Sequence, residues 1–305
     1  MGCGNWNAED WKRYSSARIS GRGAREIYRA RECDPKYDPL NIKVRESRDS
    51  ADNPLSTPII IGLDVTGSMS PILEVTAKTL GTMVGEILVR KPVTDPQIMF
   101  AAVGDSTCDR APFQATQFES DIRIASQLTE LWFERGGGGN NFESYPLAWY
   151  FAANKTSTDA WEKRGRKGFI FTMGDDCFPG KITAEEIRRV FGDRVSGDIS
   201  VKSLYAQVCR RYEVFHLMLE QGGSARFMKP DRWRELMGER AISVSDYSRL
   251  PQIIVSLMET VSGKEVNDVI DSWEDSDTRL AVRNAVGGLA DQSRRGSLGK
   301  FIRFR

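Results

Sequence analysis

Short, uninterrupted apolar runs alternate with longer segments whose apolar residues recur every three or four positions, from about residue 57 to residue 262. A short apolar run is typical of a strand buried on both faces, and the longer spacing is typical of a helix with one apolar face. The runs predict strands at residues 59–63, 97–103, 167–172, 213–219 and 241–244, with a weaker edge strand at 113–118. The periodic segments predict helices at residues 72–90, 122–133, 145–154, 183–191, 200–211, 231–238 and 250–261. This alternation predicts an α/β fold that is doubly wound: a mainly parallel central sheet with helices on both faces.

The first 56 residues do not follow this alternation, and we interpret them as an N-terminal extension. They are polar and rich in arginine and glycine, with short helices expected at residues 8–16 and 24–30 and an extended piece at 42–44. Apolar and aromatic side chains interrupt that polarity at Trp6, Trp11, Tyr14, Ile19, Ile27 and Tyr28. The extension is either an arm that docks a partner or a segment that packs back on its own domain. The tendency of large apolar side chains to be buried favours the second interpretation.

Residues 263–305 form a second extension, in which the pattern is looser. Helices are expected at residues 266–273 and 278–286, and the glycines at the end of the chain are expected to interrupt helical structure there: Gly287, Gly288, Gly296 and Gly299. The last residues, 294–305, are basic with interleaved aromatic residues and contain no acid. Such a tail either contacts phosphates or an acidic groove of a partner, or it is simply solvated. The second interpretation is favoured, because most runs of charged residues are solvated and have no binding role.

The composition of the chain indicates an ordinary globular protein and argues against several other classes. Of 305 residues, 40% are hydrophobic and 28% charged, as in ordinary globular proteins, and the net charge of +1 gives no overall field that would favour nucleic acid. No apolar run is long enough to span a membrane. The five cysteines are scattered, without a Cys-x-x-Cys pair, so neither a zinc cluster nor a disulfide framework is indicated. We therefore expect a cytoplasmic location.

The most informative stretch is the loop after the first predicted strand. Asp64, Thr66 and Ser68 stand at alternate positions directly after that strand, and Pro71 then opens a helix. Carboxylate and hydroxyl oxygens are hard ligands that suit Mg²⁺ or Mn²⁺ rather than zinc. Ligands of open α/β sheets bind at the carboxyl ends of the strands, where this loop is expected. The alternative is that these three side chains only cap the following helix.

The sequence Asp-Val-Thr-Gly-Ser, residues 64–68, resembles the Asp-x-Ser/Thr-x-Ser motif of the von Willebrand factor A domain. In that family the motif forms a metal-ion-dependent adhesion site. The order of predicted strands and helices over residues 57–262 is similar to that of the family, including an antiparallel edge strand in third place. The resemblance implies that two further loops contribute ligands to the ion.

The second of these loops corresponds to the glycine run at residues 136–139, followed by Asn140 and Asn141. The run resembles a Gly-Gly-Gly-Gly-Thr-Asp loop of some bacterial A domains, which puts Asn140 at the threonine position and implies that its carbonyl oxygen binds the ion. A phosphate-binding loop is disfavoured, because the run follows a helix and lacks the Gly-Lys-Ser/Thr of a P-loop.

The third loop follows the strand at residues 167–172. Met173 stands where family members carry an aspartate, and it cannot bind magnesium. Asp175, beyond the flexible Gly174, is therefore the expected ligand. The alternative is that Asp175 acts only as a turn or capping residue. Four residues are expected around the ion without binding it directly: Asp105, Asn141, Glu143 and Asp176.

The resemblance implies a binding function rather than catalysis. The ion, Mg²⁺ or Mn²⁺, would keep an open position for an Asp or Glu of a partner protein. For cytosolic bacterial or phage members, the family resemblance implies an adaptor of an AAA+ ATPase of the MoxR type; this chain carries no ATPase motif of its own. The alternative is a metal-dependent phosphatase or nuclease that uses the same pocket. His216, the single histidine, lies in an apolar strand and is expected in the core.

Overall fold

The computed structural model describes residues 4–134 and 142–301, and its centre is a six-stranded sheet with the strand order β10-β9-β6-β2-β3-β4. Its strands are β2 (Thr57–Asp64), β3 (Pro96–Val103), β4 (Phe113–Ala115), β6 (Gly168–Gly174), β9 (Tyr212–Leu219) and β10 (Ala241–Val244). Neighbouring strands run parallel except β3 and β4, which are antiparallel. The predicted fold class and the antiparallel edge strand in third place are therefore confirmed.

The strand order places a crevice in the middle of the sheet. The chain starts at β2, adds β3 and then β4 on one side, and returns to add β6, β9 and β10 on the other. The connections therefore leave β2 and β6 in opposite directions. In doubly wound sheets this reversal opens the crevice in which ligands bind, at the carboxyl ends of the two strands. Asp64 and Asp175 lie at those two ends.

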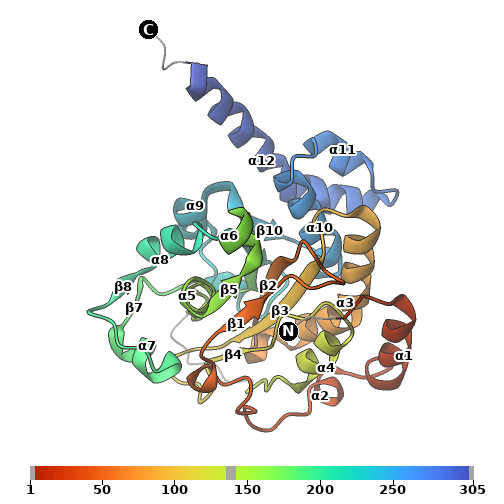
Figure 1. Ribbon diagram of the computed structural model, residues 1–305. Helices are drawn as coiled ribbons and strands as arrows, with labels where there is room; N and C mark the ends of the chain where they lie inside the picture. Colours follow the sequence, from red (N-terminus) through yellow and green to blue (C-terminus); the bar gives the residue numbers. More distant parts are fainter. Residues whose placement is uncertain (1–3, 135–141, 302–305) are drawn as a thin grey trace.

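Helices cover both faces of the sheet (Figure 1). One face carries α3 (Ser70–Arg90), α4 (Arg123–Glu130) and α10 (Leu250–Val261). The other carries α5 (Pro146–Asn154), α7 (Ala184–Phe191), α8 (Val201–Val208) and α9 (Pro230–Met237). Each face of the sheet has its own hydrophobic core: the first core lies on the α3 side and the second on the α5 side. Ile59 and Ile61 of β2 pack in the first core and Ile60 packs in the second, since successive side chains of a strand point to opposite faces. This double burial explains why the strands are apolar throughout.

The N-terminal extension packs on the α3 side of the domain. It contains α1 (Ala8–Arg18) and α2 (Ala24–Ile27), and Ile19, Ile27 and Tyr28 are buried in the first core. Trp11 packs so closely on α3 that a Cβ at Gly81 would lie 1.7 Å from its Nε1 atom. The interpretation that the extension packs back on its own domain is therefore confirmed.

Several short elements were not predicted. The extended piece expected at residues 42–44 lies slightly later, as β1 (Arg45–Ser47), and pairs in parallel with β5 (Thr156–Thr158). A second small pair joins β7 (Lys181–Ile182) to β8 (Ile199–Ser200), and α6 (Asp159–Arg164) precedes β6. These elements are too short to show a period in sequence.

The C-terminal extension consists of α11 (Val266–Asp271) and α12 (Ser276–Phe301), and the second half of α12 projects away from the domain (Figure 1). The prediction that Gly287, Gly288, Gly296 and Gly299 interrupt helical structure is wrong, because α12 runs through all four. A glycine inside a helix costs only about 1 kcal/mol, which neighbouring helix-forming residues can offset. Within the described residues, no helix combines the length and apolarity needed to cross a membrane.

Candidate metal centre

Asp64, the last residue of β2, is fully buried, and both of its carboxylate oxygens are held in place. Its Oδ1 accepts hydrogen bonds from the backbone N–H of Thr66 at 2.9 Å and from the Thr66 hydroxyl at 2.6 Å. Its Oδ2 accepts a hydrogen bond from the hydroxyl of Tyr145 at 2.7 Å. The strand thus delivers one fixed carboxylate to the crevice between β2 and β6.

A chain of oxygen atoms continues from Asp64 to the other side of the crevice. The hydroxyls of Thr66 and Ser68 lie 3.2 Å apart, and the Ser68 hydroxyl donates to Oδ1 of Asp175 at 3.1 Å. Oδ2 of Asp175 accepts the backbone N–H of Ser224 at 2.7 Å. Four of the five predicted ligand residues are thereby brought together. The fifth, Asn140, and the neighbouring Asn141 lie outside the described residues.

The capping interpretation of this loop is wrong. A single 3₁₀ turn, Gly67–Met69, precedes α3, and its N-cap residue Thr66 makes no side-chain capping bond. The N-cap of α3 itself is Met69, which also makes none. The hydroxyls of Thr66 and Ser68 are instead directed at the two aspartates.

The third loop differs from the prediction in where the strand ends. β6 continues through Met173 and Gly174, and the Met173 side chain is buried in the core on the α3 side. Asp175 comes directly after the strand, so it reaches the site without any rerouting of the loop. The flexibility expected of Gly174 is not used for a left-handed backbone conformation. Glycine is required there for another reason: a Cβ would lie 2.0 Å from the Tyr145 hydroxyl oxygen.

Of the four residues expected around the ion, three are described. Glu143 and Asp176 are buried, and Oε2 of Glu143 and Oδ1 of Asp176 have no hydrogen-bond partner among the described residues. Asp105 accepts the N–H and the hydroxyl of Thr107 at 2.8 and 2.7 Å, so it stabilises its own loop after β3. Glu143 is tied to the site because its N–H donates to the carbonyl of Cys177, just beyond β6.

Several buried carboxylates lie close together in this region, and little positive charge is present to balance them. Burial, followed by repulsion from Asp175, raises the pKa of Asp64 to about 7, against the hydrogen bonds from Thr66 and Tyr145. Burial and the nearby carboxylates, Asp64 first among them, raise the pKa of Glu143 to about 11. Burial and Asp175 raise the pKa of Asp176 to about 6. A cation would relieve each of these unfavourable interactions.

The donor set fits a hard divalent cation, since two carboxylates and two hydroxyls converge beside carboxylate oxygens that lack partners. It does not fit a site built from acidic, histidine or cysteine side chains alone. In the part of the chain that the structure describes, no three such side chains form a group able to hold an ion. An ion at this place would therefore be held by hydroxyls as well as carboxylates.

The sequence analysis did not predict two parts of the site, Tyr145 and the loop after β9. Tyr145 bridges the loops, because its hydroxyl also accepts the N–H of Asp176 at 3.3 Å. The loop after β9 closes the site from the other side: a Cβ at Gly222 would lie 2.2 Å from Cβ of Asp175, and one at Gly223 3.2 Å from Cβ of Ser68. The adjacent glycines at a strand end were the available signal for this close approach.

His216 is buried below the site, as predicted. Its ring stacks on Trp233 with centroids 3.5 Å apart, and its Nδ1 lies 3.0 Å from the Thr172 hydroxyl. Burial lowers its pKa well below the usual value, so the imidazole is neutral. His216 therefore belongs to the packing beneath Tyr145, whose ring lies at a centroid distance of 4.8 Å.

Tyr145→Phe is expected to lower the free energy of unfolding by about 2 kcal/mol, because Oδ2 of the buried Asp64 loses its donor. Tyr150→Phe is the matched control: its hydroxyl donates to Asp193, which is only half-buried, so the loss is expected to be below about 1 kcal/mol. Urea denaturation of both variants measures the difference. Equal losses would mean that the Tyr145 hydroxyl does not support the site.

Comparison with protein-family models finds no match, and neither does a search of curated proteins. Among solved structures, the chain is similar to proximal thread matrix protein 1 from the mussel byssus, with 10% identity over 67% of this chain and 47% of that one, at a TM-score of 0.43. It is also similar to the pilus adhesin SpaC from Lactobacillus rhamnosus GG, with 9% identity over 74% of this chain and 32% of that one, at a TM-score of 0.47. A further structure is the mussel protein with a zinc-occupied MIDAS motif, 13% identical over 67% of this chain and 47% of that one, at a TM-score of 0.42.

The chain therefore spans less than half the length of these solved structures. At such low identities and TM-scores the similarities do not bear on function. The chemistry of the site is decided by its own residues.

Proposed function

We propose that this chain is a protein-interaction module of the von Willebrand factor A type, which binds a divalent cation through Asp64, Thr66, Ser68 and Asp175. The observation that carries the proposal is the continuous set of oxygen contacts from Asp64 to Asp175 across the crevice. Asn140 completes the set in this proposal. Magnesium or manganese is the proposed ion, because every donor is a hard oxygen.

In this proposal, some residues of the site hold the ion in place, and one side of the site stays open to a partner. Tyr145 and the backbone of Ser224 fix the outer oxygens of Asp64 and Asp175, so the two carboxylates cannot turn away. Both carboxylates are fully buried, whereas Ser68 is half-buried and Gly67 is exposed. Among the described residues, Gly67 and Ser68 therefore mark a side from which a partner can approach. When bound, the ion supplies a positive charge with an open position for an Asp or Glu of that partner.

The kind of partner that we propose is taken from the resemblance of residues 64–68 to the von Willebrand factor A motif. We assign to this chain the role of an adaptor of a MoxR-type AAA+ ATPase, with the ion bridging to a carboxylate of the client or of the ATPase. The proposal is tested by capturing proteins from native lysate in magnesium, in EDTA, and with an Asp64→Asn variant. Proteins retained only by the parent in magnesium support it. An identical set in all three arms would contradict it.

The alternative is a phosphatase or nuclease that uses the same pocket, and among the described residues neither His216 nor the two hydroxyls of the loop after β2 is placed to act as its general base. His216 lies beneath Tyr145 in the core, and the hydroxyls of Thr66 and Ser68 are engaged with the aspartates. Turnover of p-nitrophenyl phosphate or single-stranded DNA in magnesium or manganese, abolished by Asp64→Asn, would favour the enzyme over the interaction module.

Asp175→Asn is expected to weaken magnesium binding at least tenfold, because the site loses one negative charge close to a dication. The geometry should survive, since the amide oxygen can accept the N–H of Ser224 and the amide nitrogen can donate to the Ser68 hydroxyl. Calorimetric titration of parent and variant measures the effect, with Asp231→Asn on the exposed surface of α9 as the control for charge. Equal affinity of Asp175→Asn and parent would leave Asp175 as a turn residue only.

A further inference from the structure

An apolar pocket of about 150 Å³ lies between α1 of the N-terminal extension, the second half of α3 and the start of α4. Large apolar side chains from all three elements line it: Trp6, Trp11, Val84, Leu88 and Ile122. Asn7 and Lys12, both exposed, are the polar residues of this lining. We call it the α1–α3 pocket.

Two glycines of α3, Gly81 and Gly85, explain why the pocket is there. They lie four residues apart and so face the same side of the helix. A Cβ at Gly81 would lie 1.7 Å from Nε1 of Trp11, so this ring packs directly on the helix backbone. A Cβ at Gly85 would meet nothing within 4 Å. The pocket is therefore the space that α1 leaves uncovered one turn further along α3.

Hydrogen bonds fix the elements that form the walls. Nε1 of Trp6 donates to the carbonyl of Pro96 at the start of β3, at 3.1 Å. The hydroxyl of Tyr14 in α1 donates to the carbonyl of Ala125 in α4 at 3.2 Å and lies 2.8 Å from the Thr129 hydroxyl. The pocket is thus formed before any ligand arrives, as small-molecule sites usually are.

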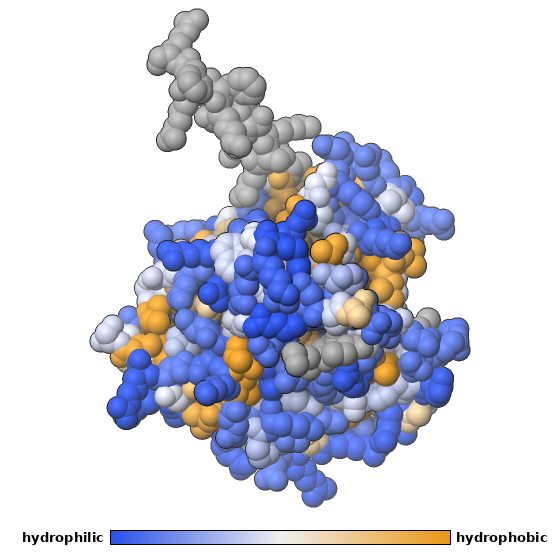
Figure 2. Space-filling model, in the orientation of Figure 1, coloured by the Kyte–Doolittle hydropathy of each residue, from blue (hydrophilic) through white to orange (hydrophobic). Residues whose placement is uncertain are grey.

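Apolar surface continues outside the pocket along α3. Leu88, at the edge of the pocket, is 37% exposed, and the next residue, Val89, is 80% exposed. Figure 2 shows hydrophobic residues at the surface near the C-terminal end of α3, at the right of the molecule. A ligand that enters across this edge removes further apolar surface from water, which favours binding.

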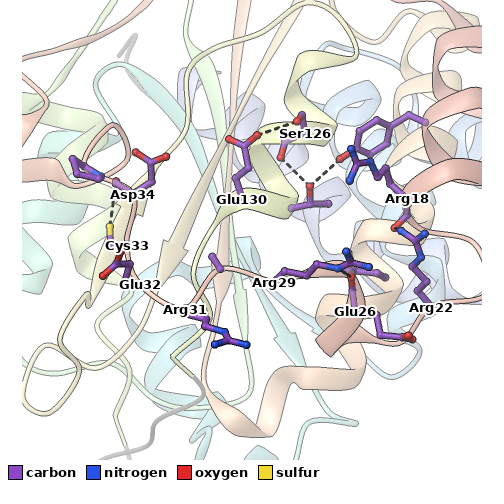
Figure 3. A pocket seen from close by; sticks show the side chains of 15 residues that line it. Arg18, Arg22, Glu26, Arg29, Arg31, Glu32, Cys33, Asp34, Ser126 and Glu130 are labelled. Carbon is purple, nitrogen blue, oxygen red and sulfur yellow. Dashed lines mark hydrogen bonds between the residues drawn. The ribbon is translucent and has the colours of Figure 1, made fainter.

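A larger cleft that α1 also lines has a different chemistry. Equal numbers of arginines and acidic residues line it, and Figure 3 shows Arg18, Glu26 and Glu130 among them. Its charges balance, so they do not indicate one class of ligand. The α1–α3 pocket has a single charged residue in its lining, Lys12, whose ammonium group is paired with Glu9 at 2.7 Å. An uncharged ligand is therefore indicated there, since burying an unpaired charge is costly.

We infer that the α1–α3 pocket binds a small, uncharged aromatic molecule of one ring. An apolar cavity of roughly 150 Å³ is large enough to hold benzene. Trp6 and Trp11 favour an aromatic ligand, because aromatic rings attract one another in offset and edge-to-face contacts. The ligand would touch α1 and α3 together and so hold the N-terminal extension on the domain. This binding goes beyond the proposed function and does not depend on the metal ion.

The test uses two probes that share one ring, fluorobenzene and 4-fluorobenzoate, with the full chain. Fluorine NMR measures the binding of each probe from the broadening of its signal. Fluorobenzene is expected to bind with a Kd of about 1 mM, as the best contacts of so small a molecule allow. The carboxylate of 4-fluorobenzoate would be buried without a partner, so this probe should bind at least tenfold more weakly.

Gly85→Leu places a side chain in the open space of the pocket and should weaken fluorobenzene binding at least tenfold. Gly287→Leu is the matched control. It makes the same change inside α12, at another glycine where a Cβ would meet nothing within 4 Å, and Gly287 does not line the pocket. This control should bind fluorobenzene as the parent does.

Equal binding of fluorobenzene to the parent and to Gly85→Leu would overturn the inference, and so would equal binding of the two probes. Binding should be the same in magnesium and in EDTA. A dependence on the ion would put the ring at the metal centre, which also overturns the inference, whereas ion binding itself is tested separately by Asp175→Asn.

A second variant covers the case in which the new leucine displaces α1. This displacement would appear as a lower Tm of Gly85→Leu than of Gly287→Leu. Leu88→Ala then replaces it, because it shortens one wall of the pocket without adding bulk. It should weaken fluorobenzene binding about threefold, since part of the apolar contact is lost. Unchanged binding to Leu88→Ala would overturn the inference.

Discussion

Asp64→Asn is expected to abolish the stabilisation of this protein by divalent cations. In the parent, an ion at one hundred times its dissociation constant should add about 2.7 kcal/mol to the free energy of unfolding and raise Tm by about 5 °C. The variant loses the carboxylate at the end of β2, so magnesium, manganese and zinc should each leave its Tm unchanged. Thermal unfolding with each ion and with EDTA measures the effect.

The same substitution is not expected to harm the metal-free fold. Asp64 is fully buried, and burial together with Asp175 raises its pKa to about 7, so its charge is unfavourable in the absence of an ion. The amide of asparagine can still accept from Thr66, and the Tyr145 hydroxyl can accept from the amide nitrogen. In EDTA, the variant should therefore melt no lower than the parent. An ion-induced rise in Tm equal to that of the parent would show that Asp64 is not a ligand.

Gly174→Ala is expected to lower the free energy of unfolding by about 3 kcal/mol. The added Cβ would lie 2.0 Å from the hydroxyl oxygen and 2.6 Å from Cζ of Tyr145. The tyrosine ring cannot move aside, because it is fully buried against Trp233 at 5.6 Å and His216 at 4.8 Å between ring centroids. Displacing it would also break the hydrogen bond to Asp64, so ion binding should weaken together with stability.

Gly85→Ala in α3 is the matched control for this substitution. A Cβ at Gly85 meets nothing within 4 Å, so alanine should stabilise the helix by about 0.5–1 kcal/mol. Adding Tyr145→Phe to Gly174→Ala should not restore stability, because the ring carbons remain too close. Chemical denaturation of the three variants tests this explanation. A loss below about 1 kcal/mol for Gly174→Ala would mean that β6 can shift away from Tyr145.

The most predictable part of the site was the part built from one continuous stretch of chain. The apolar run of β2, the oxygen-bearing residues Asp64, Thr66 and Ser68, and the helix after Pro71 follow from local periodicity and residue chemistry. Local signals were also enough to place β3, β9 and most helices, since each buries a continuous or periodic apolar set.

The end of β6 was not predictable in the same way. Met173 and Gly174 were interpreted as loop residues, because the family resemblance implied that a ligand loop follows the strand at residues 167–172. In the fold, Met173 pairs with Leu63 and Leu217, and Gly174 pairs with Met218, so the strand continues through Gly174 and Asp175 follows directly. The pairing partners of a central strand come from distant parts of the sequence, and no local pattern contains them.

By itself, the sequence determined the fold class, the strand that carries Asp64, and the oxygen chemistry of the candidate ligands, because periodicity and residue chemistry are properties of neighbouring residues. Only the tertiary structure decided that Asp175 faces Ser68, that Tyr145 holds Asp64, and that the glycines after β9 close over the site. It also placed α2 of the N-terminal extension against the first turns of α3. Those contacts join residues 45 to 155 positions apart, and they depend on how closely packed elements can approach rather than on any local preference of the chain.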